Sequence, residues 1–461
     1  MIKLIKFLIL IAVFLLYNTL FANVSLPAIF GDHMVLQQSS EVKIWGWGNP
    51  SEEITITTSW NNESVKTKTD NQAKWSVNFV TPKAGGPFEI TIQGYNTIII
   101  NDVLIGEVWL CSGQSNMEWT PSAGIDHGKE EIEKANYPSI RFFSVAKNAA
   151  KHPQLNLQGE WKVCTPETMQ YFSAIGYFFG RKIHTDLNVP VGLINSSWGG
   201  SPAEVWTPED AFEKNEIIAT AATKLKKEPW APKEPSIVYN AMIHPLVPFK
   251  IKGALWYQGE TNVQNADAYS ELLSSMIASW RDNWGDQFPF YFVQIAPYKY
   301  GDDHFNGVVV RDQQRRVLKK SDKTAMVVIS DIGNIEDIHP KNKIDVGLRF
   351  ANVALNKTYG KSEIEYSGPL FKDFSIEKNK IRVNFDFADG LANDGKITEF
   401  EIAGEDGKYY AAKAKIEKNS VLVWCSKVKA PKNVRYGWNN IAEPKLTNKT
   451  GLPTSSFKSE E

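Results

Sequence analysis

A serine stands directly after an apolar stretch of the chain, where a nucleophile is commonly presented. Residues 108–111 read as a buried strand, and Gly113-Gln114-Ser115-Asn116-Met117 follows them. A free serine hydroxyl is a poor nucleophile, so this reading requires a histidine base and oxyanion donors elsewhere. Met117 stands where a Gly-x-Ser-x-Gly elbow requires glycine, which disfavours an α/β-hydrolase.

Three further polar clusters follow predicted strands, and together with Ser115 they supply the groups that acyl transfer needs. The clusters are Ser197-Trp198-Gly199-Gly200-Ser201, Gln258-Gly259-Glu260-Thr261-Asn262 and the loop that holds His339. Ser115 would attack an ester carbonyl while His339 takes its proton. The predicted oxyanion donors are the backbone N–H of Ser115, a backbone N–H at Gly199 or Gly200, and the amide of Gln258.

The remaining polar candidates have structural readings beside the functional ones. His244 is the serious rival to His339 as the base, yet its apolar neighbours favour a pocket wall or a satisfied core histidine. Glu260 is a candidate for substrate binding, with capping of a helix start as the alternative, because acids are favoured in a first helical turn. Arg311 would bind a substrate carboxylate, with an ordinary salt bridge as the alternative.

Apolar strands alternating with helices between residues 103 and 360 position these groups. The alternation predicts an α/β fold, a doubly wound parallel sheet covered on both faces, with ligands bound beyond the carboxyl ends of its strands. The predicted strands lie at 108–111, 192–194, 254–256, 291–293 and 326–329. Apolar spacing predicts helices around 175–183 and 269–280, and Thr207-Pro208 predicts the start of another.

The flanking segments have different patterns. Residues 1–22 carry two lysines and then an apolar run, which predicts a secretory signal peptide and a secreted or periplasmic protein without membrane insertion after processing. Residues 23–102 read as a β-sandwich, and residues 361–461 as a C-terminal β-rich region.

Overall composition excludes several classes of function. The formal net charge of the 461 residues is -1, so no basic field would attract nucleic acid. Three widely spaced cysteines lack metal-ligand spacing, so we expect no zinc site, while one disulfide remains open. Fifteen tryptophans are compatible with carbohydrate surfaces, although tryptophan more often packs in a core.

Several motifs together resemble the sialate O-acetylesterase family of SGNH-type hydrolases. They are Gly113-Gln114-Ser115-Asn116-Met117, Ser196-Ser197-Trp198-Gly199-Gly200, Trp256-Tyr257-Gln258-Gly259-Glu260-Thr261-Asn262 and Asp337-Ile338-His339-Pro340, with matching segments at 239–248, 311–314 and 434–438. The resemblance implies removal of O-acetyl groups from sugars, typically the 9-O-acetyl of sialic acid, without a metal or organic cofactor. It also suggests a hydrogen bond from Asn240 near the site.

Two positions depart from the broader SGNH pattern. Gln258 stands where that group usually has asparagine, and Glu336 stands where it has the aspartate three residues before the histidine. Asp337 is the preferred orienting carboxylate, with Glu336 or a Ser–His dyad as alternatives. Deacetylation of xylan or another polysaccharide is the nearby alternative function, and a carbohydrate-binding protein without turnover is the alternative from another class. Oligomeric state is not predicted.

Overall fold

A mixed sheet at the centre of the molecule carries the strands that the sequence predicts. The computed structural model describes residues 23–460, so the signal-peptide prediction lies outside the described residues. The strand order is β13-β12-β11-β7-β10-β8-β9, and neighbouring strands are parallel except for β9, which runs antiparallel to β8. The bounds are β7 Thr97–Gly113, β8 Tyr137–Ser144, β9 Trp161–Cys164, β10 Val191–Ser197, β11 Gly253–Tyr257, β12 Phe290–Gln294 and β13 Thr324–Val328.

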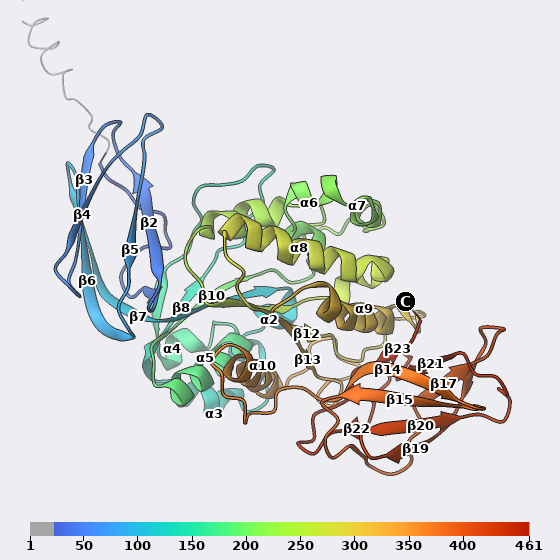
Figure 1. The fold of residues 1–461 in the computed structure, drawn as a ribbon. Helices are drawn as coiled ribbons and strands as arrows, with labels where there is room; N and C mark the ends of the chain where they lie inside the picture. Colours follow the sequence, from blue (N-terminus) through green and yellow to red (C-terminus); the bar gives the residue numbers. More distant parts are fainter. Residues whose placement is uncertain (1–22, 461) are drawn as a thin grey trace, which may run out of the picture.

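Helices cover both faces of this sheet, with α8 and α9 on one side and α5 and α10 on the other (Figure 1). The predicted helices are present as α5, α8 and α6. The α-helices are α2 Ser115–Glu118, α3 Gly128–Glu133, α4 Pro166–Met169, α5 Ala174–Leu187, α6 Glu209–Lys214, α7 Glu216–Ala222, α8 Tyr269–Trp284, α9 Asn306–Lys320 and α10 Lys343–Lys357. Shorter helical turns are η1 Pro121–Ala123, η2 Ala203–Trp206, η3 Tyr239–Ile243, η4 His244–Leu246 and η5 Glu260–Ala268. None of the described helices combines the length and apolarity needed to cross a membrane.

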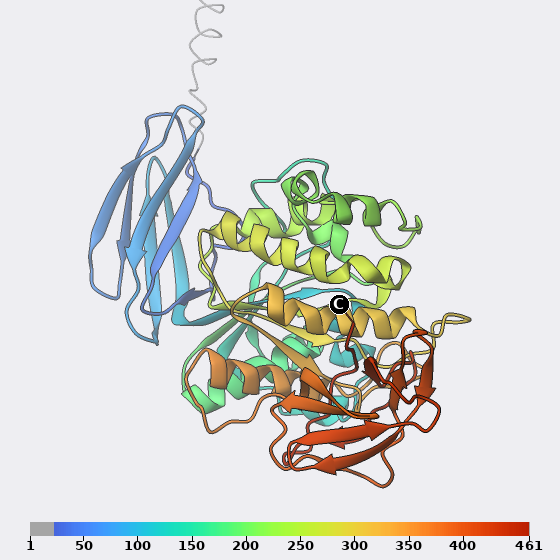
Figure 2. The same cartoon turned by 45° about the vertical axis from the view of Figure 1, so that its right-hand side comes forward.

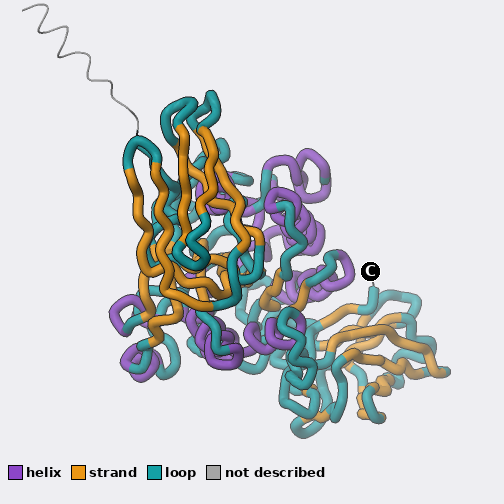
Figure 3. The backbone as a smooth tube through the Cα atoms, turned by 60° about the vertical axis from the view of Figure 1, so that its left-hand side comes forward, coloured by secondary structure: helices purple, strands orange, loops and turns teal. Residues whose placement is uncertain are grey.

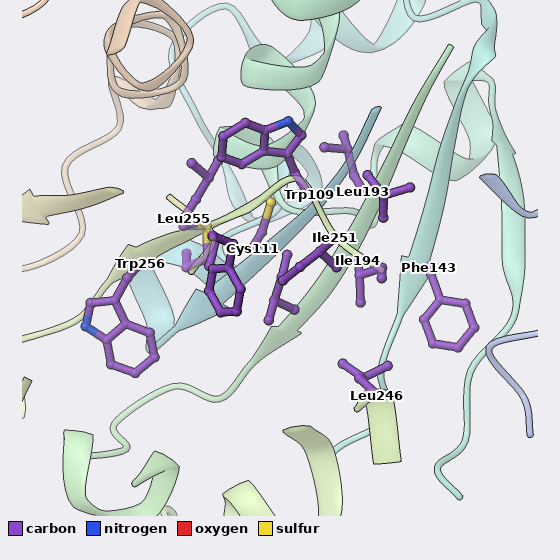
Figure 4. Packing of buried hydrophobic residues seen from close by; sticks show 14 of the residues in the cluster. Trp109, Cys111, Phe143, Leu193, Ile194, Leu246, Ile251, Leu255 and Trp256 are labelled. Atoms are coloured by element: carbon purple, nitrogen blue, oxygen red, sulfur yellow. The ribbon is translucent and has the colours of Figure 1, made fainter. Parts of the chain in front are cut away.

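Large side chains fill the space between the sheet and its helices (Figure 4). Trp109 on β7 is fully buried and packs against Phe179 at 5.0 Å and Tyr291 at 5.9 Å between ring centroids. Every residue of β7 from Val103 to Gly113 is buried, as a central parallel strand requires. Packing in the interior therefore holds β7 in place, and the carboxyl end of this strand leads to Ser115.

The N-terminal β region continues into the central sheet without a linker. Strands β2 and β5 pair on one side, and β3, β4, β6 and the first half of β7 form the other (Figure 3). The predicted boundary at 102/103 falls inside β7, so one strand belongs to both parts. The strands are β1 Val35–Gln37, β2 Glu41–Trp47, β3 Glu53–Thr58, β4 Ser64–Lys68, β5 Lys74–Val80 and β6 Gly85–Gln93.

The C-terminal β region, orange to red in Figure 2, has a hydrophobic core of its own, formed by residues between Ile381 and Phe457. Two four-stranded antiparallel sheets enclose it. The strands are β14 Leu370–Glu377, β15 Lys380–Asp386, β16 Ala392–Asn393, β17 Phe400–Ala403, β18 Tyr409–Ala411, β19 Lys413–Glu417, β20 Ser420–Trp424, β21 Asn433–Tyr436, β22 Leu446–Thr447 and β23 Phe457–Lys458.

Candidate active site

Close contact between β7 and β11 determines how Ser115 is presented. Gly113 ends β7 with φ +134°, and a Cβ there would lie 2.2 Å from the carbonyl oxygen of Tyr257. Only glycine permits this approach. The N–H of Gln114 donates to the same carbonyl at 3.0 Å, and Ser115 then begins α2. The serine hydroxyl is thereby placed beyond the carboxyl end of a central strand.

The structure brings Ser115 and His339 together from distant parts of the chain. Ser115 Oγ lies 2.9 Å from His339 Nε2, which is hydrogen-bond distance. The ring of Trp119 stacks on the imidazole, with centroids 4.3 Å apart and planes at 22°. Burial, followed by the charge of Lys343, lowers the pKa of His339 below its usual 6.5, while Asp337 opposes the shift. A lowered pKa keeps the imidazole neutral and able to accept the serine proton.

Of the two carboxylates proposed to orient the histidine, Asp337 lies nearer, but it does not hydrogen-bond to the ring. Its Oδ1 is 3.9 Å from His339 Nδ1 and accepts the backbone N–H of His339 at 2.9 Å. Glu336 is exposed and lies 3.9 Å from Lys299. The geometry therefore gives Asp337 a role in shaping the loop and places Glu336 away from the imidazole.

The loop after β10 lies beside the nucleophile and distinguishes the two predicted glycine donors. The N–H of Gly199 donates to the carboxylate of Glu118 at 2.6 Å, so it is not free to bind an oxyanion. The N–H groups of Gly200 and Ser115 have no acceptor among residues 23–460. A Cβ on Gly199 would lie 3.3 Å from Ser115 Cβ, which places this loop directly against the serine.

Gln258 is also corrected as an oxyanion donor, because its amide is fully used inside the protein. The side chain is completely buried, and Nε2 donates to Gln114 Oε1 at 3.0 Å, Asn262 Oδ1 at 2.7 Å and the Ser201 carbonyl at 3.2 Å. Gln258 thus fixes Gln114, the residue before the nucleophile. Nε2 of Gln114 donates to no described residue, which makes it the available side-chain donor.

Arg311 lies at the junction with the C-terminal region and not in the site. It is 1% exposed, and its guanidinium donates to the carbonyl of Asn440 at 3.0 Å and to that of Asn439. Burial lowers its pKa to about 10. The prediction that Arg311 binds a substrate carboxylate is therefore corrected: the residue joins two parts of the fold.

Asn240 and His244 are held by the segment around residues 150–154. Asn240 is 4% exposed, and its Nδ2 donates to the carbonyls of Ala150 and Lys151 at 3.2 and 3.1 Å. Nδ1 of His244 lies 2.9 Å from the carbonyl of Gln154. The hydrogen bonds of Asn240 therefore support this segment and leave no amide N–H directed at a substrate. His244 is a satisfied structural histidine, as its apolar sequence neighbours indicate.

Glu260 is buried beneath the site, so its predicted contact with substrate is corrected as well. It is 5% exposed, and its Oε1 accepts a hydrogen bond from Asn116 at 2.6 Å. Burial raises its pKa to about 7. Asn116 also contacts the buried Lys343, at 2.6 Å from Nζ to Oδ1. The sequence signal for Lys343 is a charge on the apolar stripe of α10, which continues through Val346 and Phe350.

Three tryptophans, each with a lysine above its ring, lie on or against the segments that follow β7 and β10. Lys341 lies 4.5 Å from the centroid of Trp119, Lys147 lies 5.9 Å from that of Trp198, and Lys233 lies 5.3 Å from that of Trp230. Trp230 is 62% exposed and packs on Gly200. We call these six residues the aromatic rim; an aromatic face with nearby cations suits a sugar that carries negative charge.

The described residues offer no metal centre. No group of three or more histidine, cysteine, aspartate or glutamate side chains in residues 23–460 is arranged to hold a metal ion. Cys111, Cys164 and Cys425 are all free thiols, so the disulfide that the sequence left open is not formed.

Known proteins resemble this chain in both sequence and fold. Residues 105–356 match the family model for carbohydrate esterases described as sialic acid-specific acetylesterases. The sialate O-acetylesterase of Rattus norvegicus is 32% identical over an alignment that covers 75% of this chain and 75% of that protein. The sialate O-acetylesterase of Homo sapiens is also 32% identical, and its alignment covers 82% of this chain and 77% of that protein. The crystal structure of a carbohydrate acetylesterase from Xanthomonas citri is 36% identical, with a TM-score of 0.86 over 95% of this chain and 99% of that one.

Proposed function

We propose a specific reaction for this chain, which belongs to the sialic acid-specific acetylesterase family of carbohydrate esterases and is a carboxylic ester hydrolase. In this proposal it removes the 9-O-acetyl group of sialic acid through Ser115 and His339. The observation that carries the mechanism is the 2.9 Å contact between Ser115 Oγ and His339 Nε2. We assign the central sheet to the SGNH type as part of the same proposal.

The proposed reaction has two steps. Ser115 Oγ attacks the acetyl carbonyl while its proton passes to His339 Nε2, and the imidazolium then protonates the departing sugar oxygen. Water, deprotonated by His339, attacks the carbonyl of the acetyl-serine; the bond from the acyl carbon to Ser115 Oγ breaks, acetate leaves, and the imidazolium returns its proton to Ser115 Oγ. The N–H groups of Ser115 and Gly200 and the amide of Gln114 stand ready for the oxyanion; each such donor typically lowers the barrier by about 3–4 kcal/mol.

An anionic sugar fits the aromatic rim better than a neutral one. Lys147 is paired with Glu118 at 2.5 Å, and Lys341 lies 3.7 Å from Asp337. Lys233 forms no ion pair among the described residues and donates only to the carbonyl of Gly200, at 2.8 Å. We therefore assign Lys233 to the carboxylate of sialic acid, with the exposed ring of Trp230 against the sugar.

Acetylated xylan is the alternative substrate, since the same serine and histidine would deacetylate a neutral polysaccharide. Export of the enzyme, suggested by residues 1–22, is part of the proposal and would give it access to either glycan.

The test compares kcat/KM for 9-O-acetylated sialic acid and for acetylated xylan, in the wild-type protein and in Lys233→Met. We expect sialate to be preferred, and we expect Lys233→Met to raise KM for sialate about tenfold, as loss of one charged contact implies. Lys413→Met is the matched control, because that lysine is exposed and lies on β19 in the C-terminal region, outside the aromatic rim. Hydrolysis of xylan alone would overturn the substrate assignment while retaining the mechanism.

A further inference from the structure

A buried lysine lies next to the proposed base. Lys343 is the first residue of α10 and is 1% exposed, although lysine is almost never buried without a partner. Its Nζ donates to Asn116 Oδ1 at 2.6 Å, and no carboxylate of the described chain comes within ion-pair distance. Retaining a charge in this position costs stability, so the lysine calls for a functional explanation.

Asn116 connects this lysine to both catalytic loops. Asn116 directly follows Ser115, and its Nδ2 donates to the carbonyl of Ile338, the residue before His339, at 3.0 Å. The same nitrogen donates to Glu260 Oε1 at 2.6 Å. One amide group therefore joins the serine turn, the histidine loop, the start of α10 and the loop after β11.

We infer that Lys343, Asn116 and Glu260 form a positioning network that holds the His339 loop against Ser115 and keeps the imidazole neutral. The inference rests on the proposed function. It accounts for a base that is correctly placed although the nearest carboxylate, Asp337, is 3.9 Å from Nδ1. The three residues touch neither the ester nor its oxyanion in this account, and they act only through the serine turn and His339.

The charges around the histidine determine the direction of the effect. Asp337, Lys341 and Lys343 face His339. Glu260, Asp337, Lys341 and Tyr257 lie around Lys343. Burial lowers the pKa of Lys343 to about 7 and raises that of Glu260 to about 7. As the pH falls both groups take up protons, so the network becomes more positive, and the positive charge of Lys343 lowers the pKa of His339.

The network therefore extends the active range of the base toward acid. Since the pKa of His339 lies below its usual 6.5, activity should rise with pH through an apparent pKa below 6.5. Removal of the lysine charge would let the pKa of His339 return upward, and the rise in activity would move to higher pH.

The double variant Lys343→Met/Glu260→Gln tests the inference, because it leaves no uncompensated buried charge. The readouts are the pH profile of p-nitrophenyl acetate hydrolysis and NMR titration of the His339 imidazole. We expect a higher pKa by both methods and a kcat lowered roughly 100-fold at unchanged KM, as a displaced catalytic group implies. Lys341→Met, at an exposed lysine, should give a smaller shift.

Asn116→Ala supplies a second variant that retains both charges but breaks the connection, and it should lower kcat without moving KM. A folded double variant with the wild-type imidazole pKa and kcat would overturn the inference. A wild-type His339 that titrates above 6.5 would also overturn it, whether or not the double variant folds. Absence of acetyl ester hydrolysis by the wild-type protein would instead refute the proposed function. In that case the NMR titration of His339 would still show whether the network lowers the pKa of the imidazole.

Discussion

At the scale of single residues, the sequence predicted that Ser115 and His339 would lie together, and their side chains are in contact, but it did not predict which neighbouring N–H groups are already bonded within the protein. Ser115 and His339 follow strand ends, and the ends of parallel strands meet at one edge of a sheet. Gly199 and Gln258 lie at the same edge, yet Glu118 and Asn262 take their N–H groups. Which acceptor an N–H group bonds to depends on the directions of the neighbouring side chains, and the spacing of motifs in the sequence does not give those directions.

Substitution of the two neighbouring acids should separate loop shape from charge. We expect Asp337→Asn to lower kcat only about tenfold, because asparagine still accepts the backbone N–H of His339 and the carboxylate makes no hydrogen bond to the ring. Glu336→Gln, at an exposed residue, should leave kcat unchanged. Steady-state kinetics on a neutral acetyl ester measures both. A loss near 10⁴-fold in Asp337→Asn, the size found when a triad aspartate is replaced, would instead identify Asp337 as a full triad member.

At the scale of helices and strands, apolar periodicity predicted the parts of the sheet that lie in the interior. The five predicted strands became the buried second half of β7 and β10, β11, β12 and β13, which are buried almost throughout. The sequence analysis did not identify β8 and β9, which lie toward one edge of the sheet and mix exposed with buried positions. The mixture of exposed and buried residues weakens the apolar signal of β8 and β9, whereas β13 at the opposite edge is buried at every position after the first.

The loop after β10 offers a prediction at this scale. Gly200 has φ +72°, and a Cβ there would lie 1.8 Å from the ring of Trp230. Gly200→Ala should therefore cost about 1–2 kcal/mol for the left-handed conformation and also displace Trp230 from the aromatic rim. We expect a lower melting temperature together with a raised KM.

Gly285→Ala is the matched control for that loop. Gly285 ends α8 with φ +63° and has open space where a Cβ would lie. Thermal unfolding should register a similar destabilisation in this variant, while KM stays at the wild-type value. Equal KM values for the two variants would show that Trp230 does not contribute to substrate binding.

At the scale of the whole molecule, the chain forms one large hydrophobic core and one smaller core. The large core runs from Val24 to Leu355 and includes the N-terminal β region, which explains why the predicted boundary at 102/103 lies within a continuous strand. Composition and turn signals locate such a change of pattern, but they do not show whether two regions share a strand. The C-terminal β region contacts the central part through buried hydrogen bonds, including those from Arg311.

Loss of Arg311 should weaken the attachment of the C-terminal region. We expect Arg311→Met to lower the free energy of unfolding by about 1–3 kcal/mol for each carbonyl left without a donor, with KM unchanged in the folded protein. Arg382→Met is the control, because Arg382 pairs with Glu377 and Glu417 within the C-terminal region at the surface. Denaturant unfolding measures the free energy of unfolding of the two variants, and steady-state kinetics measures their KM. A raised KM without loss of stability would return Arg311 to substrate binding.

The most direct measurement of the central claim is acetate release from 9-O-acetylated sialic acid by the wild-type protein and by Ser115→Ala, with melting temperatures recorded for both. We predict turnover by the wild type and a loss of at least about 10³-fold in the variant, since removal of a nucleophile leaves only the contribution of binding and oxyanion stabilisation. Mass spectrometry of the wild-type reaction, quenched in acid, should find an acetyl group on Ser115. Undiminished acetate release by a folded Ser115→Ala protein would contradict the account.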